Sequence, residues 1–118
     1  MKVAVIGASE NTSRYSNMCI NNLLNKGYQV IAYGNKKGII NQTEIQTEKI
    51  YADNIHTITL YIAANKQPEW YELILKCKPK RLIFNPGTEN PELSTLAKSA
   101  GIMVIESCTL LMLNVGDF

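Results

Sequence analysis

The chain lacks the features by which most catalytic and metal-binding domains are recognised. It contains one histidine and three cysteines, and no two cysteines form a C-x-x-C pair. Neither H-E-x-x-H nor a nucleophile elbow occurs, since Gly7-Ala8-Ser9 is not followed by the second glycine of G-x-S-x-G. We therefore expect no metal site and no catalytic residue, which argues against an enzyme.

Long hydrophobic runs and a strong charge of one sign are absent too. No apolar run approaches the roughly 20 residues of a membrane span, and Glu10 interrupts the apolar start too early for a secretory signal. The net charge is only +2 and the basic residues form no long tract, which argues against nucleic-acid binding. Cysteines without a pair motif fit a reduced, cytoplasmic setting. The 118 residues suit one domain, which we place at 1–118.

What is present is a regular alternation of predicted strands and helices. Short apolar runs predict strands at Val3–Ile6, Gln29–Tyr33, Thr57–Ala63, Leu82–Phe84 and Ile102–Ile105. Helical spacing and end signals predict helices that begin near Tyr15, Pro68, Pro91 and Thr109. This order predicts an α/β, Rossmann-like, doubly wound fold, in which a mostly parallel five-stranded sheet lies between two helical layers.

Some local expectations accompany this pattern. Ser13 or Ser16 is the predicted N-cap of the first helix, and Asn90 precedes Pro91 as the N-cap of the third. Leu93, Leu96, Ala97 and Ala100 form the predicted buried stripe of that third helix. The polar stretch Ile39–His56 has no clean period, so we expect irregular structure with at most one short helical turn.

The loop after the first strand is the strongest candidate for a binding site. It lacks the dinucleotide motif G-x-G-x-x-G, because Gly7 is the only glycine before Gly27. Small residues and a helix N-terminus nevertheless suit a phosphate, and an arginine adds a planar set of donors. The predicted phosphate-binding residues are Gly7, Ala8, Ser9, Arg14, Tyr15 and Ser16. A polar loop with a capped helix and a solvated arginine is the alternative interpretation.

The loop after the second strand lacks the Asp or Glu that usually holds the ribose 2′-hydroxyl of NAD. Asn35, Lys36 and Lys37 stand there instead, which suits a ribose with an extra phosphate, as in NADP or coenzyme A (CoA). A solvated basic turn explains them as well. Two further loops carry small or turn-forming residues that suit the wall of a ligand groove, namely Ala64, Asn65, Gly87 and Thr88. Ordinary turn formation explains the presence of these residues equally well.

The titratable residues outside these loops have simple structural interpretations. His56 precedes a strand, which places it at the edge opposite the predicted site, in an exposed or capping role. Cys19 and Cys77 fall on apolar helical faces and are expected in the core. Cys108 follows the fifth strand near a helix start. A buried inert cysteine and a thiol that forms a mixed disulfide with CoA are both possible interpretations of it.

The residues also carry a family resemblance. VIGAS with its downstream Arg14 and Ser16, PKRLIFNPGTENPEL at Pro79–Leu93 and GIMVIESCTLLML at Gly101–Leu113 resemble the small stand-alone CoA-binding-domain proteins. These are related to the nucleotide-binding N-terminal domain of the succinyl-CoA synthetase α subunit. The resemblance implies a Rossmann-like sheet with CoA across its strand ends. By position it implies phosphate contacts from Gly7, Ser9, Arg14 and Ser16, adenosine near Asn35 and Lys36, and a groove lined by Asn65, Gly87 and Thr88.

Three functions are therefore considered. The first is non-catalytic binding of CoA or an acyl-CoA, because the resemblance implies binding and does not imply ligase activity. The second is an NADP-binding reductase-like domain, and the third is an interaction module that has lost its ligand. The sequence leaves the acyl group and the oligomeric state open, with apolar residues at Leu110–Phe118 as either core or a homodimer face.

Overall fold

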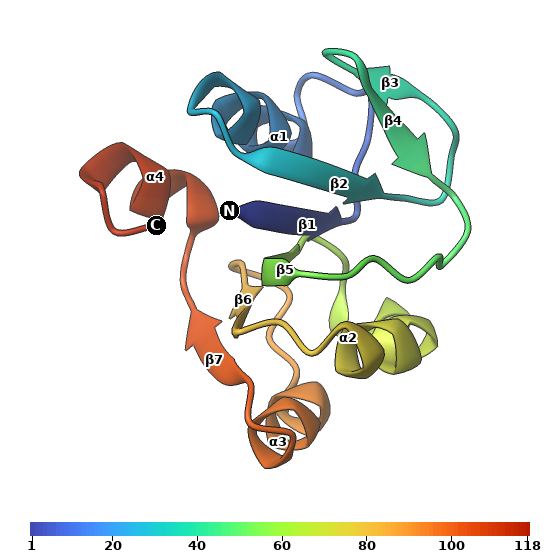
Figure 1. Cartoon of the computed structure of the whole chain (residues 1–118), viewed down its shortest axis with the longest axis vertical. Helices are drawn as coiled ribbons and strands as arrows, with labels where there is room; N and C mark the ends of the chain where they lie inside the picture. Colours follow the sequence, from blue (N-terminus) through green and yellow to red (C-terminus); the bar gives the residue numbers. More distant parts are fainter.

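Seven strands form one twisted sheet in the computed structural model, which describes residues 1–118 (Figure 1). The strands are β1 (Lys2–Ile6), β2 (Gln29–Tyr33), β3 (Ile39–Ile40), β4 (Thr43–Gln46), β5 (Ile55–Leu60), β6 (Arg81–Phe84) and β7 (Met103–Glu106). Their order in the sheet is β3-β4-β2-β1-β5-β6-β7, and every neighbouring pair except β3–β4 is parallel. The predicted Rossmann-like, mostly parallel sheet is confirmed, but the predicted number of five strands is wrong.

The two additional strands lie in the stretch expected to be irregular. β3 and β4 form a hairpin in which Ile40 pairs with Thr43, so its loop is the two residues Asn41 and Gln42. Both loop residues have positive φ, 46° and 72°, as the favoured two-residue hairpin turns require. β4 then joins β2 in parallel through Ile45 and thereby extends the sheet. Each strand is too short to show a period of two, which is why the sequence pattern did not reveal them.

Helices cover both faces of the sheet, as predicted. They are α1 (Tyr15–Asn25), α2 (Tyr71–Cys77), α3 (Pro91–Ser99) and α4 (Thr109–Val115), with short 3-10 turns at Ala64–Lys66 and Pro68–Trp70. One buried cluster joins Val3 and Val5 of β1 to α1 and α4, and a second joins Ala4 and Ile6 to α2 and α3. Figure 1 shows α1 and α4 on the side of the sheet opposite α2 and α3. No helix is both long and apolar enough to span a membrane.

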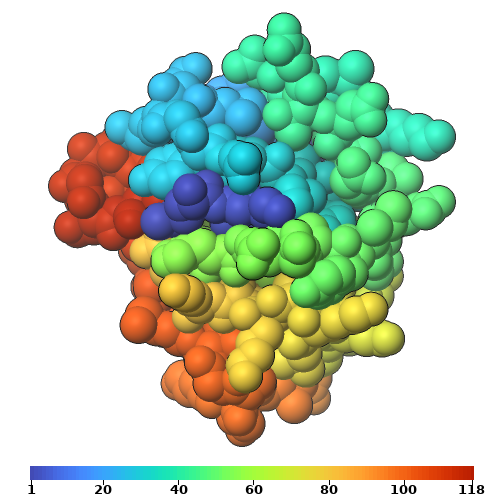
Figure 2. Space-filling view, in the orientation of Figure 1, coloured from blue at the N-terminus to red at the C-terminus, as the bar shows by residue number.

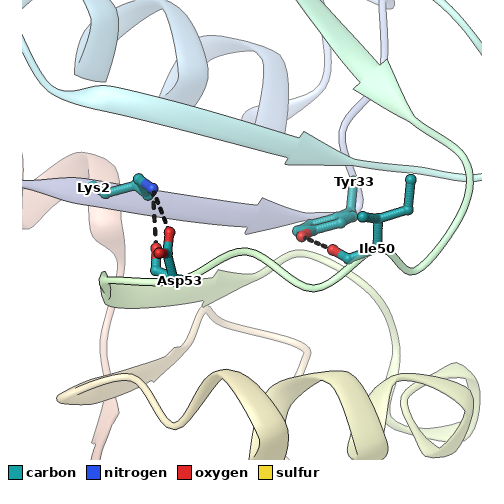
Figure 3. Close-up of polar contacts among 4 residues, drawn as sticks. All are labelled: Lys2, Tyr33, Ile50 and Asp53. Carbon is teal, nitrogen blue, oxygen red and sulfur yellow. Dashed lines mark hydrogen bonds and ion pairs between the residues drawn. The ribbon is translucent and has the colours of Figure 1, made fainter.

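An extended strap replaces a helix between β4 and β5. The strap, residues 47–54, crosses the sheet on the side of α2, and Tyr33 Oη donates a 2.6 Å hydrogen bond to the Ile50 carbonyl. Lys2 Nζ donates to the Asp53 carbonyl at 2.9 Å and lies 3.5 Å from its carboxylate (Figure 3). Figure 2 shows the strap (green) on the molecular surface beside β1. These ties hold an irregular segment in place without a helix.

The helix ends confirm one predicted cap and correct another. Asn90 caps α3 by accepting hydrogen bonds from the N–H groups of Glu92 and Leu93. The predicted cap of α1 is wrong, because Arg14 occupies the N-cap position and no side chain caps that helix. Ser13 lies one residue before the N-cap position and Ser16 lies inside the first turn, so neither stands where a side-chain oxygen caps the helix.

Burial agrees with the predicted helix faces except at two residues of the third helix, where Ala100 is half-buried at the C-cap position and Leu96 is exposed. Cys19 and Cys77 are buried, as predicted, and so are Leu93 and Ala97 of α3. Leu96 is 39% exposed, against the prediction of a buried stripe. The stripe is narrower than expected because α3 covers the end of the sheet beside the edge strand β7.

Candidate ligand-binding site at the carboxyl edge of the sheet

The order of the strands reverses at β1, and this reversal marks the place where open α/β sheets bind ligands. From β1 the chain proceeds to β2 on one side, while β5, β6 and β7 follow on the other. At the end of β1, Gly7 has a φ of 105°, and a Cβ there would lie 3.0 Å from the Tyr61 carbonyl group. Glycine is needed here because the loop after β1 passes directly over the end of β5.

The first loop, residues 7–14, is held by its own hydrogen bonds. The N–H groups of Gly7 and Ala8 both donate to the Tyr33 carbonyl, at 2.9 and 2.8 Å, so neither is free for a ligand. Asn17 Nδ2 donates to the Ser9 carbonyl at 2.9 Å, which fixes the first turn of α1 beside Ser9. Any phosphate in this loop must therefore use groups that follow Ala8.

The N-terminus of α1 supplies such groups. The N–H groups of Tyr15, Ser16 and Asn17 lie in the first turn and therefore have no partner within the helix. No side chain caps the helix either, so these groups are available to a ligand. The helix dipole adds partial positive charge at the same place. Arg14 and Tyr15 are exposed, whereas Ser16 is buried. The Arg14 side chain makes no hydrogen bond or ion pair in the protein, so its guanidinium is free to meet an anion.

The first and second loops meet around a hollow of about 130 Å³. It is lined by Ala8, Ser9, Glu10 and Asn11 from the first loop, by Asn35, Lys36 and Lys37 from the second, and by Ile45 of β4. The structure thus brings the predicted residues Ala8, Ser9, Asn35 and Lys36 together. Lys36 and Lys37 form no salt bridge, so the hollow carries two unpaired cations. This electrostatic character suits an anionic ligand.

Glu10 lines the same hollow, and sequence analysis did not single it out. Its Oε2 accepts a 2.9 Å hydrogen bond from the Ile39 N–H, and a Cβ at position 38 would collide with its carboxyl group. Figure 1 shows the connection from β1 passing the end of β2 towards the β3–β4 hairpin before it enters α1. Beyond Glu10 a larger hollow of about 690 Å³ opens between the hairpin and Ile50 of the strap. No local pattern reveals this contact, because it joins residues 29 positions apart.

None of the other predicted residues lines these two hollows. Some belong to the first loop or the start of α1, namely Gly7, Arg14, Tyr15 and Ser16. The rest lie on other loops of the same edge. Ala64 and Asn65 begin a 3-10 turn after β5, and Asn65 is exposed. Gly87 is exposed at a positive φ of 91°. Thr88 is only 5% exposed, and its hydroxyl donates to the Asn85 carbonyl at 2.8 Å.

A buried polar network ties these two loops together. Gln67 is fully buried, and its Nε2 donates to the carbonyls of Ile62 and Thr88 at 3.0 and 2.7 Å. Its Oε1 accepts from Asn90 Nδ2 at 2.9 Å, and Asn90 also contacts the Tyr71 hydroxyl at 2.8 Å. Gln67 therefore links the loop after β5 to the loop after β6, which makes this part of the edge rigid.

Asn85 anchors a second buried network. Its Nδ2 donates to Thr59 Oγ1 and to the Leu60 carbonyl, at 2.7 and 2.8 Å, and its Oδ1 accepts from the Thr109 N–H at 2.8 Å. The Thr59 and Thr109 hydroxyls also lie 2.8 Å apart. The asparagine thus joins β5, β6 and the start of α4. No local pattern singles out Asn85, and only the tertiary contacts reveal its role.

Thiols and a phenol meet beside this network. The Tyr61 hydroxyl is buried without a hydrogen-bond partner of good geometry, and burial raises its pKa strongly, with further contributions from nearby Cys19 and Cys108. Burial raises the pKa of the Cys19 thiol to about 11. Cys108 is half-buried at the N-cap position of α4. His56 lies at the amino end of β5, at the opposite edge, where its Nδ1 contacts Thr57 Oγ1 at 2.8 Å.

Solved structures resemble this chain closely. A crystal structure of an uncharacterized protein is 40% identical with a TM-score of 0.97, over 99% of this chain and 97% of its own. A hypothetical protein from Pyrococcus horikoshii OT3 is 25% identical with a TM-score of 0.84, over 92% of this chain and 78% of its own. The dinucleotide-forming acetyl-coenzyme A synthetase 1 of Ca. Korarchaeum cryptofilum, solved with phosphate and ADP, is similar in fold alone. It is 18% identical with a TM-score of 0.73, over 90% of this chain and 25% of its own.

No curated protein matches the chain. The family model of the CoA binding domain, in contrast, matches residues 1–114, which is nearly the whole sequence. The match covers the first loop, the second loop and the two buried networks described above. The chain therefore belongs to the CoA binding domain family.

Proposed function

We propose that this protein binds CoA or an acyl-CoA across the carboxyl ends of its strands and does not itself catalyse a reaction. The observation that carries the proposal is the hollow between the first two loops, which is lined by two unpaired lysines and by Ser9, the residue that Asn17 ties to the uncapped start of α1. This supplies separate cationic positions for a diphosphate and for a phosphate on the ribose. The family to which the chain belongs favours CoA as the ligand with this charge pattern.

In the proposed complex the diphosphate lies at the start of α1. Because Gly7 and Ala8 have no free N–H, the donors are the Ser9 hydroxyl, the first-turn N–H groups of Tyr15 and Ser16, and the Arg14 guanidinium. Gly7 contributes by letting the loop pass close to β5. Ala8 contributes a small wall of the hollow.

The adenosine end lies at the second loop. Lys36 binds the 3′-phosphate of the ribose, and Asn35 offers amide hydrogen bonds beside it. From the diphosphate the pantetheine arm runs over Ala64 and Asn65 towards Gly87 and the backbone at Thr88. The Asn85 and Gln67 networks hold these loops in place, so little ordering is needed on binding.

Thermal unfolding with added CoA, NADP, NAD or ATP tests the ligand. At 100 times its Kd a ligand stabilises the folded chain by about 2.7 kcal/mol, which corresponds to a Tm increase of roughly 10 °C in a domain of this size. We expect this increase with CoA. An increase with NADP and none with CoA would overturn the proposal, and no increase with any of the four would favour a module without a ligand.

Dephospho-CoA tests the role of Lys36, because it lacks only the 3′-phosphate. We expect Lys36→Ala to weaken CoA binding by roughly tenfold, the loss of one charge-assisted hydrogen bond, and to leave dephospho-CoA binding unchanged. The matched control is Lys26→Ala. It removes a lysine that is also exposed but lies at the C-cap of α1, at the end of the helix away from the proposed phosphate site. Equal weakening of both ligands by Lys36→Ala would place the 3′-phosphate elsewhere.

A further inference from the structure

Glu10 is a negative charge at a site that otherwise suits anions. Its carboxylate is exposed, and it lines both the 130 Å³ hollow and the larger one beyond. It forms no salt bridge with Lys36 or Lys37, although both lysines line the same hollow. The carboxylate instead accepts the hydrogen bond from Ile39 N–H, which holds it against Gly38.

One oxygen of Glu10 remains free in this position. Oε2 accepts the backbone hydrogen bond, whereas Oε1 has no hydrogen-bond partner in the protein. An ionised carboxylate accepts hydrogen bonds only, so a neighbouring hydroxyl group can donate to Oε1 but a neighbouring phosphate is repelled. The free oxygen therefore distinguishes a hydroxyl from a phosphate.

The position of Glu10 also compensates for the missing acidic residue after the second strand. Domains that bind NAD usually carry an acid at the end of the second strand, which holds the ribose 2′-hydroxyl. Here the residues after β2 are Gly34, Asn35 and two lysines. Glu10 brings a carboxylate from the loop after β1 into the hollow that Asn35 and the lysines line, because that loop reaches across to the β3–β4 hairpin.

We infer that Glu10 selects ligands whose adenosine ribose has a free 2′-hydroxyl and a phosphate at the 3′ position. In this arrangement Glu10 Oε1 accepts a hydrogen bond from the 2′-hydroxyl, while Lys36 binds the 3′-phosphate. A 2′-phosphate is rejected because it would face the carboxylate. The inference rests on the proposed function and adds a residue that separates CoA from NADP by charge.

Two adenosine bisphosphates test this directly. We expect the full chain to bind adenosine 3′,5′-bisphosphate at least about tenfold more tightly than adenosine 2′,5′-bisphosphate in calorimetric titration, since a charge-assisted hydrogen bond is worth roughly that factor. Glu10→Gln keeps an acceptor for the Ile39 N–H and removes the charge. This variant should bind the 2′,5′ isomer roughly tenfold more tightly than the unsubstituted chain does.

The matched control is Glu44→Gln, which removes the same charge from an exposed residue of β4 in the larger hollow only. It should leave the preference unchanged. A preference that survives in Glu10→Gln, or that falls equally in Glu44→Gln, would overturn the inference.

A measurement without any variant guards against misfolding of Glu10→Gln. Removing the 2′-hydroxyl, in 2′-deoxyadenosine 3′,5′-bisphosphate, should weaken binding to the unsubstituted chain by roughly tenfold. Equal binding of the deoxy and ribo forms would overturn the inference while CoA binding stands. If CoA itself causes no thermal stabilisation, the proposed function fails together with the inference, so the two failures are distinguishable.

Discussion

The two arginines of the chain form a matched pair of substitutions that separates ligand binding from folding. Arg14 is exposed at the N-cap position of α1, and its side chain contacts no protein group by hydrogen bond or ion pair. Arg81 lies at the opposite edge of the sheet. Its Nε donates to Thr57 Oγ1 at 2.6 Å, and its guanidinium carbon lies 4.3 Å from the centre of the Phe118 ring. Replacing either residue by alanine removes the same charge.

The expected magnitudes differ because the contacts differ. Arg14→Ala removes charge-assisted hydrogen bonds to phosphate, worth about 1.5–3 kcal/mol, and should weaken CoA binding by roughly 10- to 100-fold. The free energy of unfolding should change by less than about 0.5 kcal/mol, as is usual at an exposed site. Arg81→Ala loses two hydrogen bonds, to Thr57 Oγ1 and to the Phe118 carbonyl, and a cation–π contact. It should therefore cost about 2 kcal/mol of folding stability and lower Tm by roughly 8 °C.

Calorimetric titration with CoA and urea unfolding, carried out on both variants, measure the two quantities separately. The expected outcome is that Arg14→Ala changes only the Kd and Arg81→Ala changes only the free energy of unfolding. A large loss of stability in Arg14→Ala would make Arg14 a structural residue. Unchanged CoA binding in a stable Arg14→Ala variant would refute the phosphate site at the start of α1.

Two further predictions follow from the buried network and the half-buried thiol. Asn85→Ala should lower the free energy of unfolding in urea by about 3 kcal/mol, because it leaves several buried groups without partners, whereas the exposed Asn65→Ala should have almost no effect. A loss of less than about 1 kcal/mol of unfolding free energy in Asn85→Ala would contradict the anchoring role of Asn85. With CoA disulfide, the Cys108 thiolate should form a mixed disulfide and release CoA thiol, visible as an adduct by intact mass spectrometry. Modification of the buried Cys19 instead, or a Cys108 that stays unmodified while CoA is bound, would contradict a complex in which the thiol of CoA lies near α4.

Most of the parallel core could be predicted from the sequence. The bounds of β2 and the start of α4 agree with prediction, and Asn90 caps α3 as expected. These features depend on neighbouring residues, whose apolar spacing and end signals can be recognised locally. The β3–β4 hairpin escaped prediction because its strands are short and its turn uses Asn41-Gln42 in place of glycine.

The candidate site was predictable only in part. The sequence indicated that the loops after β1 and β2 would meet, and the hollow does join Ser9 to Lys36. It also placed Gly7 and Ala8 among the phosphate-binding residues, but the N–H groups of both are engaged by the Tyr33 carbonyl. Which donors remain free depends on how β1 and β2 pair, and no local pattern reports that.

Local patterns in the sequence predicted the alternation of strands and helices, the mainly parallel sheet and the edge at which a ligand should bind. Those properties follow from apolar periodicity and from the rule that parallel strands end at a common edge. The folded structure was needed to show that Glu10 and Lys36 line one hollow, that Asn85 holds α4 to β5, and that the start of α1 is uncapped. The first two are contacts between residues far apart in the chain. The third depends on where α1 begins, because Arg14, whose side chain has no acceptor, occupies the N-cap position in place of a serine.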